Sequence, residues 1–219
     1  MNQAQKTVRL CGEDLSAFQR SHICAFFRTS DERYRMLMPF IREGMEQGDK
    51  ALHIVNPSLR TDHTQRISEG GIDAGRAEVE GQLEVIGWYD GPLRGGRFDL
   101  SEWIASLPVV LGNGRTQGFP LTRLIADMEW LLKDRDANDR ALEFECRVNL
   151  ALPKDGDVAI CAYDLDKFGA AIVVDALRTH PMVLISGIVQ HNPFYVPPEE
   201  LLKELNAREP PNIGSSATA

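Results

Sequence analysis

The sequence predicts an α/β protein built on a doubly wound, mostly parallel sheet of five to six strands. Short, continuous apolar runs alternate with longer amphipathic stretches along the 219 residues. This is the pattern of strands that are buried on both faces and connected through helices, with right-handed crossovers. Hydrophobic residues make up 43% of the chain, enough for one large core, and no repeat or low-complexity tract divides it.

In the first half of the chain, three apolar runs predict strands at residues 23–27, 51–55 and 83–88. Thr29 and Glu32 follow the first run with the spacing of a capping box, which predicts that a helix begins there. Pro39 lies inside this helix and should kink it. A weak surface helix around residues 66–67 separates the second and third strands.

In the second half, apolar runs predict strands at residues 121–128, 158–163 and 182–188. Apolar residues recurring every three to four positions predict helices at residues 98–111, 138–150 and 165–176. Asp99 is a candidate N-cap for the first of these helices. Pro198 suits the first turn of a closing helix, whose apolar side we expect to pack on the sheet and which carries Leu201, Leu202 and Leu205.

A flexible N-terminus at residues 1–14 and a disordered tail at 208–219 are expected to flank one domain at residues 15–207.

Composition limits the partners of the chain. The net charge of −8 argues against nucleic acid or an anionic membrane as a partner. Neither a membrane-spanning apolar stretch nor a signal-peptide core is present, so we expect a cytoplasmic protein.

The segment after the first predicted strand does not have the composition of a phosphate-binding loop. Such a loop needs glycines, whose backbone amides wrap the phosphates, followed by a lysine. Residues 28–33 contain no glycine and include the carboxylates Asp31 and Glu32, which would repel a triphosphate. Ordinary ATP hydrolysis is therefore not expected.

Two carboxylates follow the predicted strand that ends near Met128. Ligands of doubly wound sheets bind beyond the carboxyl ends of the strands, where Asp127 and Glu129 are expected to lie. There they can orient a ligand or hold Mg²⁺ and a nucleotide, and the structural alternative is that they cap a turn. Position at a strand end is the only support for a functional role.

Histidine and cysteine positions allow, but do not specify, a metal site. His22 and Cys24 point to one face of a strand, and Cys161 can lie on a neighbouring strand. Because free cysteines are mostly buried, we interpret these three as packed sheet residues and predict no metal and no cofactor. His63 is expected on a polar surface segment, and His180, which precedes a proline, in a turn.

The residues above, taken in order, resemble the MEDS (methanogen/methylotroph, dichloromethane-regulator-type sensory) domain family over roughly residues 15–205. The matching motifs are His22-x-Cys24, Asp31-Glu32-x-Tyr34, Pro39-Phe40-Ile41-x-Glu43-Gly44, Arg123-x-x-Ala126-Asp127-Met128-x-Trp130, Glu143-x-Glu145 with Asn149, Cys161-x-Tyr163-Asp164, His180-Pro181 and Asn192-Pro193-Phe194-Tyr195. The resemblance implies a RecA-like or KaiC-like three-layer fold without a phosphate loop. It also implies sensing of small molecules, hydrocarbon derivatives among them, and transmission to output modules.

The leading hypothesis is a non-catalytic, small-molecule-sensing domain in bacterial signal transduction or transcriptional regulation. The ligand would contact residues at the strand ends: Thr29, Glu32, Tyr34, Asp127, Glu129, Trp130 and Tyr163. No output module is recognisable beside the matched region, so we expect action through a separate signalling protein or through self-association into a homo-oligomer. The expected ligand is small and at least partly apolar.

Two alternatives remain open. One is a nucleotide-binding or slow nucleotide-hydrolysing enzyme that uses Asp127 and Glu129 with Mg²⁺. The other is an adaptor module for a kinase or an anti-sigma factor, docking through the closing helix.

Overall fold

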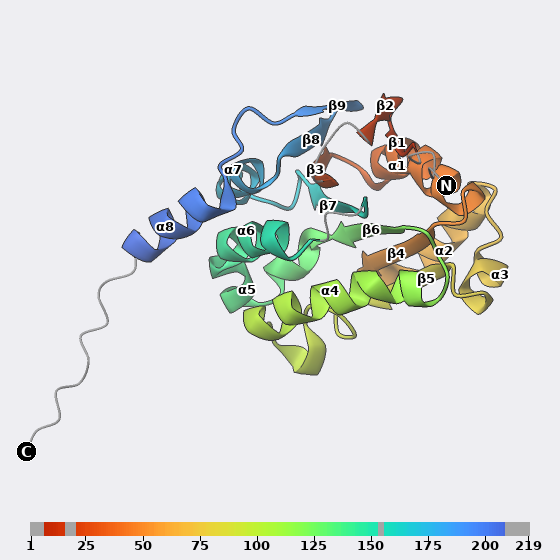
Figure 1. Cartoon of the computed structure of the whole chain (residues 1–219), viewed down its shortest axis with the longest axis horizontal. Helices are drawn as coiled ribbons and strands as arrows, with labels where there is room; N and C mark the ends of the chain where they lie inside the picture. The colour runs from red at the N-terminus through yellow and green to blue at the C-terminus, as the bar shows by residue number, and fades with distance from the viewer. Residues whose placement is uncertain (1–6, 16–20, 153–155, 209–219) are drawn as a thin grey trace, which may run out of the picture.

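The computed structural model describes residues 7–15, 21–152 and 156–208, and it confirms the α/β class. Seven strands form one sheet in the order β5-β4-β6-β7-β3-β8-β9 (Figure 1). All neighbours are parallel except the last pair, β8 and β9. The strands are β3 (Ser21–Phe27), β4 (Lys50–Val55), β5 (Leu83–Gly87), β6 (Thr122–Asp127), β7 (Val158–Asp164), β8 (Met182–Ile185) and β9 (Ile188–His191).

Helices cover both faces of the sheet, which gives the predicted three layers. One face packs against α1 (Ser30–Glu46), α2 (Arg60–Glu69) and α3 (Ala74–Val79). The other packs against α4 (Leu100–Thr116), α6 (Ala141–Ala151) and α7 (Ala170–Thr179). Shorter helices are η2 (Pro57–Leu59), η3 (Arg94–Gly96), η4 (Met128–Leu132) and α5 (Arg135–Asp139). Strands buried on both sides explain why their sequences are continuous apolar runs.

The helix starts follow their local sequence signals. The Thr29 hydroxyl accepts a hydrogen bond from the Glu32 backbone N–H at 3.1 Å, as the capping box predicts. The Glu32 carboxylate accepts from the Arg28 N–H at 2.9 Å. Asp99 caps α4 in the same way. Helix α1 continues through Pro39 to Glu46, although proline has no backbone N–H to donate within the helix. Packing of the helix on the sheet before and after Pro39 stabilises it there.

Ordered structure begins earlier than the sequence predicts. Within the segment expected to be flexible, β1 (Arg9–Leu10) and β2 (Glu13–Asp14) form a small antiparallel hairpin. Cys11 and Gly12 turn between the strands with φ of 50° and 89°. Val8, Leu10 and Leu15 are buried in the core on the α1 side of the sheet, and their burial holds the hairpin in place. Residues 1–6 and the predicted tail from 209 onwards lie outside the described residues.

The predicted strand at residues 182–188 is wrong in its length. The structure divides it into β8 and β9, joined by a tight turn at Ser186 and Gly187, which have φ of 51° and 79°. Two positive φ values are typical of the two-residue turns of hairpins. The sheet therefore has six parallel strands, the upper end of the predicted range, and an antiparallel seventh strand at its edge.

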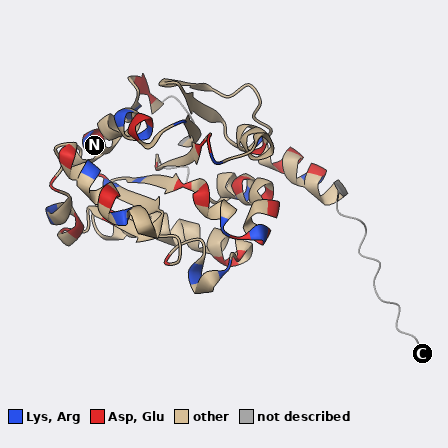
Figure 2. Ribbon diagram, turned by 180° about the vertical axis from the view of Figure 1, so that it is seen from behind, with Lys and Arg blue, Asp and Glu red and all other residues tan. Residues whose placement is uncertain are grey.

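The closing helix α8 (Pro198–Arg208) packs on α6 rather than on the sheet. Leu201 is buried against Leu142 and Cys146 of α6. Among the described residues, none of the helices combines the length and the apolar composition that a bilayer crossing requires. Figure 2 shows Lys and Arg interspersed with Asp and Glu along the helices.

A buried arginine ties α1 to the sheet. Arg123 on β6 pairs with Asp49 at 2.9 Å and with Glu43 at 3.0 Å, and donates to the Phe40 carbonyl at 2.9 Å. Its side chain passes over Gly44, where an added Cβ would lie 2.6 Å from the arginine Cδ. The close approach of helix and strand therefore depends on a residue without a side chain.

Candidate functional site

The carboxyl ends of β3, β6 and β7 meet where the chain leaves the sheet in two directions. Helix α1 follows β3 to one face of the sheet, and α7 follows β7 to the other. The crevice between such diverging connections is the usual ligand position in doubly wound sheets. A cavity of ≈ 60 Å³ lies there, lined by Phe27, Thr29, Ser30, Arg33, Leu59, Asp127, Glu129, Ala162, Tyr163, Asp164 and Lys167.

Charges of both signs surround this cavity. An Asp127 oxygen lies 3.6 Å from the Arg33 guanidinium, and the other oxygen accepts the Glu129 backbone N–H at 3.0 Å. Burial raises the pKa of Asp127 to about 6, although the charge of Arg33 opposes this shift. Lys167 donates to Glu129 at 2.5 Å and lies 3.3 Å from Asp164. The cavity thus presents two cations and three carboxylates to one small volume.

The structure brings four of the seven predicted ligand contacts to this cavity: Thr29, Asp127, Glu129 and Tyr163. Tyr34 lies in a neighbouring, narrower cavity that shares Arg33 and Asp127. Glu32 is used at the start of α1, where it accepts a backbone hydrogen bond, and does not line either cavity.

Trp130 lies in the core instead of at the cavity. Its ring centroid is 5.2 Å from those of Phe98 and Phe144, and the side chain is 1% exposed. The chain enters the short helix η4 directly after Asp127, and this tight turn directs Trp130 back beneath the sheet edge. Proximity to a strand end in sequence does not distinguish an inward from an outward side chain.

Tyr34 belongs to a buried chain of aromatic polar groups. Its hydroxyl is hydrogen-bonded to His63 Nδ1 at 2.6 Å, and His63 Nε2 to His53 Nδ1 at 2.8 Å. Burial lowers the pKa of His63 to about 2 and that of His53 to about 3, so both rings are neutral. The prediction that His63 lies on the surface is wrong, because α2 turns this residue and Ile67 inward from an otherwise polar sequence.

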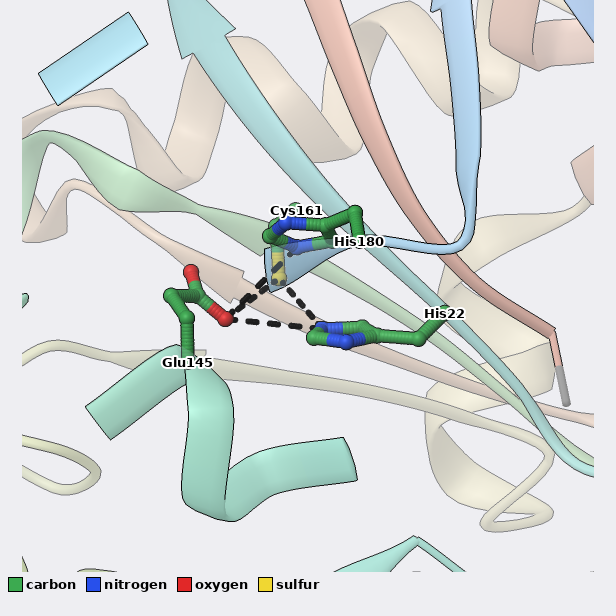
Figure 3. A group of neighbouring side chains, drawn as sticks. All are labelled: His22, Glu145, Cys161 and His180. Carbon is green, nitrogen blue, oxygen red and sulfur yellow. Dashed lines mark hydrogen bonds and ion pairs between the residues drawn. The ribbon is translucent and has the colours of Figure 1, made fainter. Parts of the chain in front are cut away.

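A second polar cluster is fully buried on the other face of the sheet, beneath α6 and α7. Its side chains are His22 of β3, Cys161 of β7, Glu145 of α6 and His180, which follows α7 (Figure 3). One donor atom from each lies within 4.8 Å of those from the other three. The sequence predicts that His180 lies in a turn. In the structure the residue ends α7, but its side chain points inward and is fully buried.

Burial dominates the proton affinities in this cluster. It lowers the pKa of His22 to about 4 and raises that of Glu145 to about 7. The pKa of His180 is well below its usual value, and that of the Cys161 thiol well above. The two imidazoles and the thiol are thereby neutral near neutral pH, whereas the Glu145 carboxyl, with a pKa of about 7, is partly ionised there.

Tyr163 connects the cluster to the cavity. The residue lines the cavity at the end of β7, and its hydroxyl donates to Glu145 at 2.5 Å. The sequence signals for this arrangement were the alternation of Cys161 and Tyr163 on one strand face and the helical spacing of Glu145 and Asn149. The meeting of strand and helix residues could not be derived from spacing alone.

The fold and the cavity define a doubly wound α/β domain with a small polar site at the strand ends. The model of the family described as "MEthanogen/methylotroph, DcmR Sensory domain" (MEDS) matches residues 21–181. The chain belongs to this family of sensory domains.

A curated relative is the transcriptional repressor DcmR of Methylorubrum extorquens, which is 25% identical over 178 residues. The aligned region covers 81% of this chain and 63% of the repressor, so the chain spans less than two thirds of that protein. Among solved structures, the fold is similar to that of an uncharacterized protein from Pyrococcus horikoshii, solved with an unknown peptide. The TM-score is 0.55 at 13% identity, covering 75% of this chain and 76% of the other.

Proposed function

We propose that the chain senses a small molecule in the cytoplasm for bacterial signal transduction or transcriptional regulation, and acts through a separate partner protein. The observation that carries this proposal is the cavity between the ends of β3, β6 and β7, with its paired charges. Family membership supports a sensory role, and the similarity to a transcriptional repressor supports a regulatory output.

The size of the cavity limits the ligand. One buried water needs a cavity volume of roughly 10–15 Å³, so a cavity of ≈ 60 Å³ accommodates about four waters. Phe27, Ala162 and Tyr163 provide apolar wall, and the charged groups lie around it. The ligand is therefore a compound of about four to six non-hydrogen atoms with an apolar part and a polar group.

The charge pairing favours binding over nucleotide chemistry. Asp127 faces Arg33, and Glu129 is bonded to Lys167, so both carboxylates have protein cations as partners. Mg²⁺ would have to displace these cations from both carboxylates. A triphosphate also exceeds the cavity volume. We therefore propose a non-enzymatic role.

The ion pair between Lys167 and Glu129 offers a route for the signal. It joins the segment before α7 to η4, and both residues line the cavity. A ligand whose polar group replaces one partner of this pair would favour a different arrangement of the two segments. Only such unequal binding to two conformations transmits a signal.

A thermal-shift screen with one- to four-carbon alcohols, amines, carboxylates and halocarbons tests the proposal. We expect at least one compound to stabilise the protein, and its Kd to rise tenfold or more in the double variant Glu129→Gln/Lys167→Met, since charge-assisted hydrogen bonds contribute about 1.5–3 kcal/mol. The matched control is Glu78→Gln/Arg60→Met. It removes an ion pair with an N···O distance of 2.7 Å whose two residues do not line the cavity.

The control variant should bind as the unmodified chain does. Equal loss in both double variants, or no stabilising compound in the screen, would refute the proposed site. A shift that requires both ATP and Mg²⁺, and that disappears in Asp127→Asn, would favour the nucleotide alternative.

A further inference from the structure

We propose that His22, Glu145, Cys161 and His180 form a four-coordinate site for a divalent first-row transition-metal ion, with zinc as the expected occupant. The four side chains come from four separate elements and meet at one buried point (Figure 3). This site does not depend on ligand binding at the strand-end cavity, and its test is separate.

Four of the six distances between the donor atoms have the length expected in a tetrahedral zinc site. Zinc binds nitrogen, oxygen and sulfur at 2.0–2.3 Å, which places neighbouring ligand atoms about 3.3 to 3.8 Å apart. His22 Nε2 lies 3.4 Å from Cys161 Sγ and 3.5 Å from Glu145 Oε2. Glu145 Oε2 lies 3.6 Å from His180 Nε2 and 3.8 Å from Cys161 Sγ. These four separations match edges of a zinc coordination shell, and the other two pairs, which join His180 to His22 and to Cys161, lie within 4.8 Å.

The surrounding hydrogen bonds determine which nitrogen of His22 faces the cluster. Asn149 donates through Nδ2 to the carbonyls of Glu145 and Thr179, at 3.1 and 2.5 Å, which fixes its amide orientation. Its oxygen, 3.2 Å from His22 Nδ1, must then accept a hydrogen bond, so this nitrogen carries the hydrogen and donates it. The lone pair of His22 therefore lies on Nε2, which points at the other donors.

The same logic applies to His180 and Glu145. His180 Nδ1 lies 2.7 Å from the Ala176 carbonyl, which can only accept, so Nδ1 carries the proton and Nε2 the lone pair. The Tyr163 hydroxyl donates to Glu145 Oε1 and leaves Oε2 directed at the cluster. Metal-binding histidines and carboxylates are typically held by such outer hydrogen bonds.

Two imidazole lone pairs, a carboxylate oxygen and a sulfur thus converge where water is excluded. In the described part of the chain, His180 Nε2 is buried with no hydrogen-bond partner. Unsatisfied buried acceptors are costly, and a single divalent cation would satisfy all four groups at once. Binding would release the thiol proton and favour the thiolate.

The donor set selects the kind of metal. Calcium and magnesium require oxygen ligands, whereas imidazole, thiolate and one carboxylate suit zinc and its neighbours. Four protein ligands leave no open coordination position, which is characteristic of structural sites. The ion would fasten α6 and the end of α7 to β3 and β7, and Tyr163 would connect it to the cavity wall.

Metal analysis of the full chain, purified without chelators and with any histidine tag removed, tests the proposal. We expect about one zinc per chain by inductively coupled plasma mass spectrometry. After exchange with Co²⁺, we expect the intense visible bands of a tetrahedral ion and a thiolate-to-cobalt charge-transfer band. Iron in place of zinc, lost in the same variants as described next, would also support the site.

Cys161→Ala should abolish the charge-transfer band. The matched control is Cys24→Ala, because Cys24 is equally buried and lies directly opposite Cys161 in the β3–β7 register. This control should retain the band and the metal. Asn149→Ala, which keeps all four ligands, should weaken metal binding by about 10- to 100-fold and gives a second readout if Cys161→Ala does not fold.

Three results would overturn the proposal. They are a folded protein that takes up neither zinc nor cobalt, a charge-transfer band that persists in Cys161→Ala, and a band that is lost in Cys24→Ala. The first would show that the four groups form a hydrogen-bonded network.

Discussion

Replacing Asp127 by asparagine should stabilise the protein at neutral and alkaline pH. Asp127 lies 4% exposed at the end of β6, with Arg33 at 3.6 Å as its nearest cation. Burial raises its pKa from an ordinary value near 4 to about 6, so the folded protein disfavours the charged form despite that cation. Asparagine has no charge, and its oxygen can still accept the Glu129 backbone N–H.

The magnitude follows from the pKa. A carboxyl group whose pKa is raised on folding contributes stability at low pH that is lost as the pH rises through the folded-state value. A shift of roughly two units corresponds to about 3 kcal/mol. The Asp127→Asn variant should therefore exceed the unmodified chain in unfolding free energy by about 3 kcal/mol at pH 8 and by only about 0.5 kcal/mol at pH 4.

Urea unfolding, followed by the fluorescence of the buried tryptophans, measures this difference at both pH values. Asp134→Asn is the matched control, since Asp134 also caps a helix but its pKa is lowered by the backbone N–H groups of Ala137 and Phe98. That variant should lose stability at pH 8. If Asp127→Asn were no more stable than the unmodified chain at pH 8, the ion pair with Arg33 would outweigh burial, and the reasoning would be refuted.

Three further substitutions test the packing around the two faces of the sheet by urea unfolding. Gly44→Ala should cost about 1–3 kcal/mol, because its Cβ would lie 2.6 Å from the pinned side chain of Arg123; a neutral effect would show that the arginine can shift. Trp130→Ala should lower the unfolding free energy by about 3–5 kcal/mol and leave ligand affinity unchanged, whereas a selective loss of affinity would show that Trp130 contacts the ligand. Tyr34→Phe should cost about 1 kcal/mol equally at pH 5 and pH 8, because His63, with a pKa of about 2, is neutral at both; a pH-dependent cost would contradict that assignment.

Much of the fold could be predicted because its signals are local. Strands buried on both faces, such as β3 and β7, give continuous apolar runs, and the caps at Thr29 and Asp99 lie within four residues of the groups they bind. The turn between β8 and β9 also had a local signal, the Ser186-Gly187 pair. The prediction of a single strand is wrong there because apolar residues lie directly on both sides of this short pair, as they would in one continuous strand.

The candidate sites depend on contacts that sequence spacing does not specify. The strand ends could be located, and with them Asp127 and Tyr163, because all parallel strands end at one edge. Whether a residue such as Trp130 faces the cavity or the core is decided by one tight turn. The meeting of His180 with Glu145 requires two helices to pack on the same face of the sheet, which no short motif encodes.

Amide chemical-shift mapping by NMR tests the central claim most directly. The full, isotope-labelled chain would be titrated with a compound that stabilises it in the thermal-shift screen. We predict the largest shifts at the amides around the cavity, in residues 29–33, 127–129 and 163–167, with no comparable change at the groove beside Trp103 and Val110. Shifts centred on that groove, or confined to the surface away from the strand ends, would contradict the account.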